Sequence, residues 1–181
     1  MNAAAARAST SSSYFELFGL PQAFSIDLPA LEKAYRDIQS RVHPDRFAHA
    51  GEAERRASLL WTTRVNEGFQ VLKSPVSRAR HLLELHGVDV AFETNTAMPQ
   101  QFLMQQMELR ESLETAVHGK DPGGLAKLQK DLQGEKEGLE KQLAERIDRD
   151  QDYAAAAGLV RELQFLEKLE AEIDSAYETL G

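Results

Sequence analysis

The stretch AYRDIQSRVHPDRF, residues 34–47, decides the fold, because it joins an amphipathic helix to a proline corner. Asp27 is a good N-cap for this helix, and Pro29 is tolerated in its first turn. Pro44 lacks an N–H and disfavours helical geometry in the preceding residue, so the helix is predicted to end near His43. Its apolar face is formed by Leu28, Leu31, Ala34, Tyr35, Ile38 and Val42, which recur at helical spacing.

Two further helices are predicted around this one. A short helix at 14–18 precedes the stop signal Gly19-Leu20-Pro21. A long helix at 52–73 follows the corner and is ended by Pro75. Together the two long helices predict a helical hairpin. The expected buried stripe of the second one consists of Ala57, Leu60, Trp61, Val65, Phe69 and Leu72.

The back half of the chain predicts a helical bundle. A short helix at 76–86 closes at Gly87, and a polar connector runs to Pro99. Amphipathic helices follow at about 99–118, 125–148 and 152–180, and three helices of this length are expected to pack antiparallel. No strand-like alternation is present, so the predicted fold class is all-α. The expected organisation is a disordered tail at 1–13, a first domain at 14–75, a linker helix with its connector at 76–98, and a three-helix bundle at 99–181.

Composition narrows the possible functions. The 181 residues are 42% hydrophobic and 28% charged, which is ordinary for a soluble protein, and no run approaches the ~20 apolar residues of a membrane span. The absence of cysteine removes disulfides, thiolate metal sites and a cysteine nucleophile. Of the net charge of -8, residues 1–75 contribute +1 and residues 76–181 contribute -9. The acidic half disfavours nucleic acid as a partner.

The tripeptide His43-Pro44-Asp45 is weak as a motif on its own, and a plain helix stop with exposed loop residues would also produce it. Its context, however, resembles the J-domain family, in which this tripeptide stimulates the ATPase of a DnaK-type chaperone and the basic face of the preceding helix docks. The resemblance is carried by YFELFGLP at 14–21, the HPDR end of the 28–43 helix, and VNEGFQVLKSP at 65–75 before Arg78. It implies a chaperone-binding set of His43, Pro44, Asp45, Lys33, Arg36, Arg41 and Arg46.

The chemistry of the corner agrees with such a role. Pro44 fixes the loop, so that His43 and Asp45 lose little entropy on binding, and Asp45 can accept a charge-assisted bond from a partner arginine. Lys33 and Arg36 lie on one side of the helix, although the same stripe would also suit plain solvated surface. An acid–base pair is disfavoured, because no nucleophile or metal ligand accompanies the two residues and the proline is expected to project them apart.

The first helix of the expected bundle carries more apolar surface than its core needs. Its core stripe accounts for Phe102, Leu109, Leu113, Ala116 and Val117. Leu103, Met104 and Met107 fall ~100–200° from that stripe, edged by glutamates. This second stripe is either a binding surface, for which methionine is well suited, or a face that packs against the 76–86 helix. Phe165 lies ~80° from the core line of the last helix and is expected at the edge of the bundle.

The segments FLMQQMELRESLE and LVRELQFLEKL, with the J-domain before them, resemble the HscB family of iron–sulfur cluster co-chaperones. This resemblance implies the chaperone HscA and the cluster scaffold IscU as partners, no cofactor, and a cytoplasmic location. A further acidic contact of that family falls on Thr115, for which Glu114 can substitute in part. Without cysteines the chain resembles the bacterial form and is expected to bind no zinc. The implied scaffold-binding residues are Leu103, Met104, Met107, Glu108, Glu111 and Phe165.

Two alternatives stay open at this point. One is a J-domain protein with a different client, which a binding assay with a cluster scaffold would distinguish. The other is a structural or oligomerising helical module in which the tripeptide is incidental. That second reading predicts that no DnaK-type partner changes its ATPase rate when the protein is added.

Overall fold

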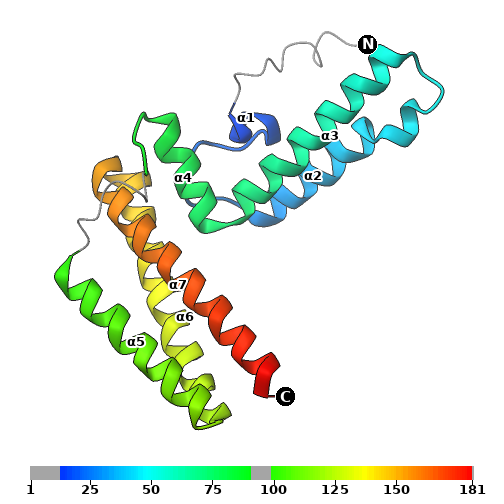
Figure 1. Cartoon of the computed structure of the whole chain (residues 1–181). Helices are drawn as coiled ribbons and strands as arrows, with labels where there is room; N and C mark the ends of the chain where they lie inside the picture. The colour runs from blue at the N-terminus through cyan, green and yellow to red at the C-terminus, as the bar shows by residue number, and fades with distance from the viewer. Residues whose placement is uncertain (1–12, 91–98, 181) are drawn as a thin grey trace. The chain divides into compact units, whose positions relative to one another are not determined.

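The computed structural model describes residues 13–90 and 99–180. The chain divides into two compact units, Met1–Leu85 and His86–Gly181 (Figure 1). All regular structure in the described residues is helical, which confirms the predicted all-α class. Residues 1–12 of the expected tail and most of the connector lie outside the described residues, whereas Ser13, also assigned to the tail, is buried and caps α1. No helix within the described ranges is long and apolar enough to cross a membrane.

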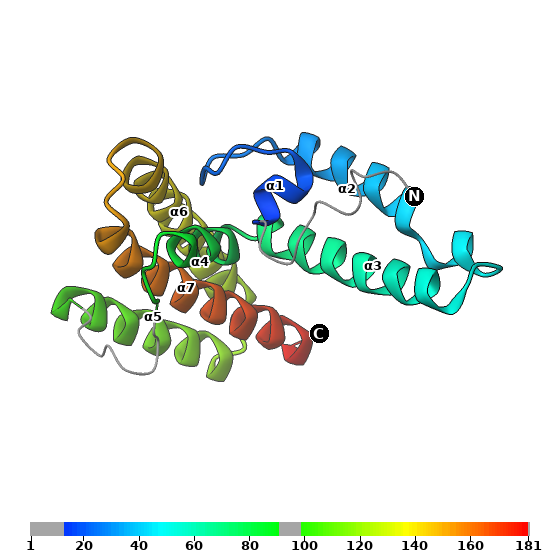
Figure 2. The same ribbon diagram turned by 90° about the horizontal axis from the view of Figure 1, so that it is seen from above.

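The first unit is built on a helical hairpin. Its helices are α1 (Tyr14–Phe18), α2 (Leu28–Val42), α3 (Glu52–Lys73) and α4 (Pro75–Leu85), with a 3-10 turn η1 (Pro44–Phe47) after α2. The hairpin formed by α2 and α3 is seen along its length in Figure 2, and α1 and α4 both pack on α3. The helix order and the end of α2 predicted from Pro44 are therefore confirmed.

Local sequence signals explain the helix ends in this unit. The Asp27 side chain accepts a hydrogen bond of 3.0 Å from the Ala30 N–H and caps α2. The Ser13 hydroxyl accepts from the Glu16 N–H at 3.3 Å and caps α1. Gly19 closes α1 with a φ of 67°, a left-handed conformation that glycine adopts without strain.

The buried stripe of α3 differs from the predicted one at Leu60. Val65 and Leu72 are buried as expected, and the other three predicted residues besides Leu60 are half-buried. Leu60, however, is 67% exposed, and Ser58 is only 4% exposed. The reason is helical phase: Ser58 contacts α2, and Leu60 lies ~200° away on the opposite face of α3. Hydrophobicity alone predicts that Leu60 is buried. The hairpin instead buries Ser58, whose hydroxyl makes a hydrogen bond from α3 to α2.

Helix α4, predicted as a linker helix, belongs to the first unit and contributes to its core. It buries Val76, Ala79, Leu82 and Leu83. Arg78 is also buried, and its Nη1 donates to the Leu72 carbonyl at 2.7 Å while the guanidinium lies 4.9 Å from the centre of the Phe24 ring. This arginine therefore ties α4 to the end of α3 and to the segment between α1 and α2.

Helix α1 is held between α3 and α4 by close packing. The Tyr14 N–H donates to His81 Nε2 at 3.3 Å, and the His81 ring stacks on Phe15 with centroids 5.8 Å apart. Burial lowers the pKa of His81, an effect to which Arg64 contributes and which Glu84 opposes. On α3, Gly68 permits this approach, because a Cβ there would lie 2.6 Å from Tyr14 Cδ1.

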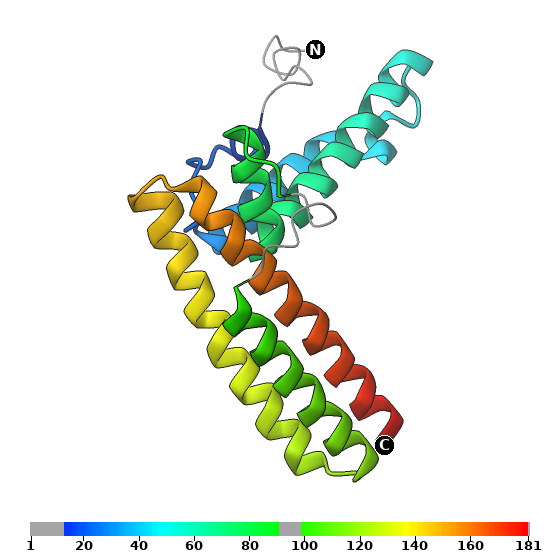
Figure 3. The same cartoon turned by 60° about the vertical axis from the view of Figure 1, so that its left-hand side comes forward.

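The second unit is a three-helix bundle of α5 (Gln100–His118), α6 (Pro122–Ala144) and α7 (Tyr153–Leu180). The three helices lie side by side along their length (Figure 3), and each contacts the other two. Helix α6 begins three residues before the predicted start, because Pro122 is well suited to the first position of a helix. The core includes Phe102, Leu113, Leu125, Leu132, Leu143, Leu163, Leu166 and Ile173.

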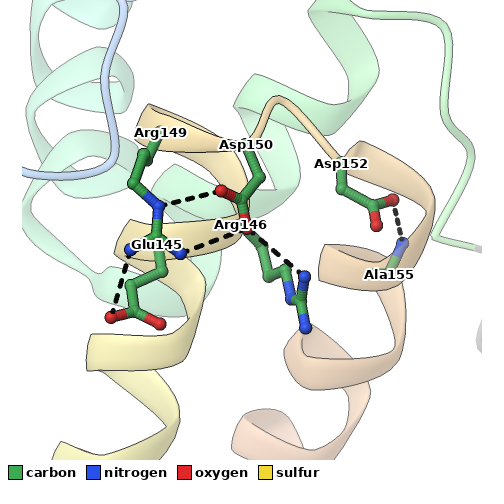
Figure 4. A network of polar contacts seen from close by, with 6 residues as sticks. All are labelled: Glu145, Arg146, Arg149, Asp150, Asp152 and Ala155. Carbon is green, nitrogen blue, oxygen red and sulfur yellow. Dashed lines mark hydrogen bonds and ion pairs between the residues drawn. The ribbon is translucent and has the colours of Figure 1, made fainter.

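The turn from α6 to α7 is stabilised by charged residues (Figure 4). Helix α6 continues into a π-helical turn, Glu145–Arg149, in place of the regular helix predicted to 148. Arg149 Nε donates to Asp150 Oδ1 at 2.9 Å, a hydrogen bond that lowers the pKa of Asp150. Asp152 then caps α7 by accepting from the Ala155 N–H at 3.1 Å.

Candidate functional site

The His43-Pro44-Asp45 tripeptide lies at the exposed corner that follows α2. The N–H of Asp45 donates to His43 Nδ1 at 3.3 Å, so the imidazole caps the 3-10 turn η1. This turn brings Asp45 Oδ2 to 3.5 Å from His43 Nδ1. The expectation that the proline projects the two side chains apart is therefore wrong, because η1 folds the backbone back onto the imidazole.

This pair has little shielding from water. The Asp45 side chain is 91% exposed, and the His43 side chain is 48% exposed. General acid–base chemistry depends on a substrate held against the two groups, usually with water excluded. An exposed carboxylate at a fixed corner instead suits a charge-assisted hydrogen bond to a cation of another protein.

The basic residues expected at this site divide into two kinds. Lys33, Arg36 and Arg41 lie exposed on α2. Arg36 Nη1 forms an ion pair of 3.9 Å with Glu32 Oε2, one helical turn earlier. Arg46 differs, because its Nη1 donates to the Ser40 carbonyl at 2.8 Å. The first three are thus available at the surface, and the fourth also holds the corner to α2.

The outer face of α5 carries the second expected site. Leu103, Met104 and Met107 are 44%, 57% and 64% exposed, although the core stripe of the same helix is buried at Phe102 and Leu113. Large side chains of this kind on one helix face form an apolar strip on the surface. The carboxylates of Glu108 and Glu111, also exposed, lie along its edge.

Phe165 lies at the edge of the bundle, as predicted. Its half-buried ring packs edge-on against Phe102, with ring centres 5.8 Å apart. The guanidinium of Arg110 lies 5.6 Å from the centre of the same ring, and Arg110 Nη2 is 3.5 Å from Glu172 Oε1. Phe165 is therefore covered on one side by a cation that sequence reasoning missed. Arg110 follows Leu103 by seven residues, or about two helical turns, which could have indicated that both share a side of α5.

The carboxylates of α5 face a groove of about 810 Å³ between α5 and α6. Glu108, Glu111 and Thr115 line its α5 wall, and Lys127 and Asp131 line its α6 wall. Thr115, where the family resemblance places a further acidic contact, thus lies beside the two glutamates. Within residues 13–90 and 99–180, no group of three or more histidine or carboxylate side chains is arranged to hold a metal ion.

A helical hairpin that presents His-Pro-Asp, joined to a three-helix bundle, defines a J-domain protein of two units. Residues 98–174 match the family described as the HSCB C-terminal oligomerisation domain. The co-chaperone protein HscB homolog of Azoarcus sp. (strain BH72) is 52% identical over 167 residues, which cover 92% of this chain and 94% of that protein. The chain belongs to the HscB family of co-chaperones.

Solved structures agree with this assignment. The chaperone HscB from Vibrio cholerae superposes with a TM-score of 0.84 at 35% identity, covering 94% of this chain and 100% of that one. The human co-chaperone protein HscB superposes with a TM-score of 0.87 at 25% identity, covering 92% of this chain and 82% of that one. The family and the all-helical fold expected from the sequence are thereby confirmed.

Proposed function

We propose that the protein stimulates the ATPase of a DnaK-type chaperone, HscA, and delivers the iron–sulfur cluster scaffold IscU to it in the cytoplasm. The observation that carries the proposal is that one chain exposes two chemically different surfaces. These are the His43-Pro44-Asp45 corner on the first unit and the apolar strip of Leu103, Met104 and Met107 on the second. The cluster is cargo of the scaffold in this proposal, and the protein itself binds the scaffold rather than the metal.

Charge and shape support the division of roles. The corner offers a carboxylate and an imidazole beside the exposed cations of α2, which suits an ATPase domain with complementary charges. The strip on α5 offers adaptable apolar side chains edged by Glu108 and Glu111, which suits a client with apolar residues beside basic ones. Linking both surfaces in one chain raises the effective concentration of client at the chaperone.

The direct test measures the ATPase rate of HscA with the protein alone, with IscU alone, and with both. We expect stimulation by the protein, and a larger effect when IscU is also present. Stimulation without any response to IscU would indicate a J-domain protein with another client. An unchanged rate for every DnaK-type chaperone tried would contradict the proposal.

Self-association of the bundle is a second candidate function. It is favoured by the description of the matched family domain as an oligomerisation domain and by the exposed strip on α5, which two copies could bury against each other. Sedimentation of the protein at micromolar concentrations tests it. Dimers that are lost when Met104 and Met107 are replaced by serine would support this role for the strip.

A further inference from the structure

Pro44 leaves the C-terminal end of α2 short of hydrogen-bond donors. In a regular helix, each carbonyl accepts from the N–H four residues later. The carbonyl of Ser40 would need the N–H of residue 44, which proline lacks. The carbonyl of Val42 would need the N–H of Arg46, which donates to the His43 carbonyl instead, at 3.0 Å. The carbonyls of Ser40 and Val42, next to the corner, therefore need donors other than the helical N–H groups.

Side chains supply these donors. Arg46 Nη1 donates to the Ser40 carbonyl at 2.8 Å. From α3, Ser58 Oγ donates to the Val42 carbonyl at 2.5 Å, and Thr62 Oγ1 lies 3.2 Å from the same oxygen. The Thr62 hydroxyl has one proton and also reaches the Ser58 carbonyl at 2.9 Å, so it shares its proton between two acceptors.

The hydroxyls of Ser58 and Thr62 both reach the backbone directly before the corner. Ser58 is 4% exposed and Thr62 is half-buried, and both cross the hairpin to the residue that immediately precedes His43. A side chain as buried as Ser58 is out of reach of a partner protein. Any effect of Ser58 on partner binding must therefore be transmitted through Val42 and the corner.

We propose that Ser58 and Thr62 are positioning residues that fix the Val42 carbonyl, and with it the direction in which His43 and Asp45 leave α2. The inference rests on the proposed function of the corner as a chaperone contact. A corner that is ordered before binding loses less conformational entropy when the partner arrives, so it binds at lower concentration. Pro44 restricts the backbone from within the chain, and the two hydroxyls restrict it from the neighbouring helix.

The test compares variants that differ in hydroxyl groups alone. The pair Ser58→Ala with Thr62→Val removes both donors and keeps the β-branched shape at position 62. Thr62→Ser keeps the hydroxyl and serves as the conservative rescue. Thr63→Val is the matched control, because the Thr63 hydroxyl donates locally to the Leu59 carbonyl at 3.1 Å on the exposed side of α3.

The readout is the ATPase rate of HscA as a function of the concentration of each variant. For the double variant, we expect the half-maximal concentration to rise about tenfold, the cost of ordering roughly one more residue on binding, with maximal stimulation within about twofold of the unaltered chain. Thr62→Ser and Thr63→Val are expected within about twofold on both measures. A role in stability alone would lower the melting temperature without moving the half-maximal concentration of the folded protein.

A second readout needs no partner. Amide hydrogen exchange of Arg46, whose N–H donates within the corner, is expected to be about tenfold faster in the double variant and unchanged in Thr63→Val. If the double variant does not fold, Thr62→Val alone carries the same test with a smaller expected shift.

The outcomes separate this inference from the proposed function. An unchanged half-maximal concentration in a folded double variant, or an equal shift in Thr63→Val, overturns the positioning role. If the unaltered chain stimulates no chaperone while exchange at Arg46 still responds as expected, the proposed function fails and the structural role of the two hydroxyls stands.

Discussion

The corner after α2 and the outer face of α5, the two surfaces of the proposed function, differ in their chemistry and in how firmly their groups are held. The corner consists of polar groups whose backbone is held by a proline and by side-chain hydrogen bonds from Arg46, Ser58 and Thr62. The face of α5 presents long apolar side chains on the surface of a helix, two of them methionines. A fixed polar corner favours one partner geometry, whereas flexible apolar side chains can adapt to a client that changes shape. The comparison predicts that substitutions at one surface leave the activity of the other intact, and that the two sets of substitutions reduce different activities.

The largest expected effect is at the corner. Replacing Asp45 by Asn or His43 by Gln is expected to reduce stimulation of the HscA ATPase by at least about 100-fold, measured as the apparent kcat/KM with respect to this protein. The reason is that a charge-assisted bond buried in the complex is worth several kcal/mol. Binding of IscU, measured by calorimetry, is expected to stay within about twofold. His49→Gln, an exposed histidine in the loop between η1 and α3, is the control. Equal loss of both activities in a folded Asp45→Asn variant would contradict the separation.

The next effect is at the apolar strip. Replacing Leu103, Met104 and Met107 together by alanine is expected to weaken IscU binding about 100-fold, or ~2.7 kcal/mol, as for the loss of a hot-spot cluster. Stimulation of the ATPase in the absence of IscU is expected to stay unchanged. The matched control is Leu59→Ala with Leu60→Ala, which removes leucines that are 59% and 67% exposed on the first unit. Weakening by the control pair would show that surface hydrophobicity in general, rather than this strip, binds the client.

A smaller effect is expected from the carboxylates beside the strip. Neutralising Glu108 and Glu111 to glutamine is expected to slow IscU association about fivefold at low ionic strength and to have little effect in 0.5 M salt, because exposed charges act mainly through screened long-range attraction. Stopped-flow measurement of the association rate tests this. The control neutralises two exposed carboxylates on α7, through Asp174→Asn and Glu178→Gln. A salt-independent loss would indicate direct, desolvated contacts instead.

The smallest expected effect is the change of folding stability with pH, which has opposite signs in the two units. Burial lowers the pKa of His81 in the first unit, so its contribution to stability is present above about pH 6.5 and is lost as the pH falls through the lower folded-state value. Burial raises the pKa of Glu162 and Glu167 in the second unit, so that unit gains stability as the pH falls toward their ordinary range.

Fluorescence of Trp61, the single tryptophan, follows urea unfolding of the first unit, and circular dichroism follows both. His81→Gln, whose amide can still accept from the Tyr14 N–H, should remove the pH dependence of the fluorescence midpoint between pH 7 and pH 5. A midpoint that keeps its full pH dependence in this variant would assign the effect to other groups.

The sequence predicts the helices well where a side chain or a proline determines an end. Asp27 and Pro44 bound α2, and Pro75 separates α3 from α4, as expected. It predicts less well where tertiary contacts decide. The burial of Ser58 in place of Leu60 depends on the phase of α3 against α2. The π-helical turn at the end of α6 packs on α7 and buries Ile147, a tertiary contact that local sequence signals do not show.

The same distinction applies to the candidate sites. The exposure of Leu103, Met104 and Met107 follows from the helical projection, because one bundle helix buries only one face. The placement of Arg110 over Phe165 joins two helices that are far apart in the sequence, so periodicity within either helix cannot show it. The hydroxyls that hold the corner were missed for the same reason.

The most direct test of the adaptor claim asks whether both surfaces must be on the same chain. A chain with Asp45→Asn is mixed with a chain carrying the three alanine substitutions on α5, and the IscU-dependent increase in the HscA ATPase rate is measured at concentrations where the protein is monomeric. The account predicts that the mixture stays as inactive as either variant alone, because neither chain can hold client and chaperone together. Recovery of most of the unaltered activity in the mixture would contradict it.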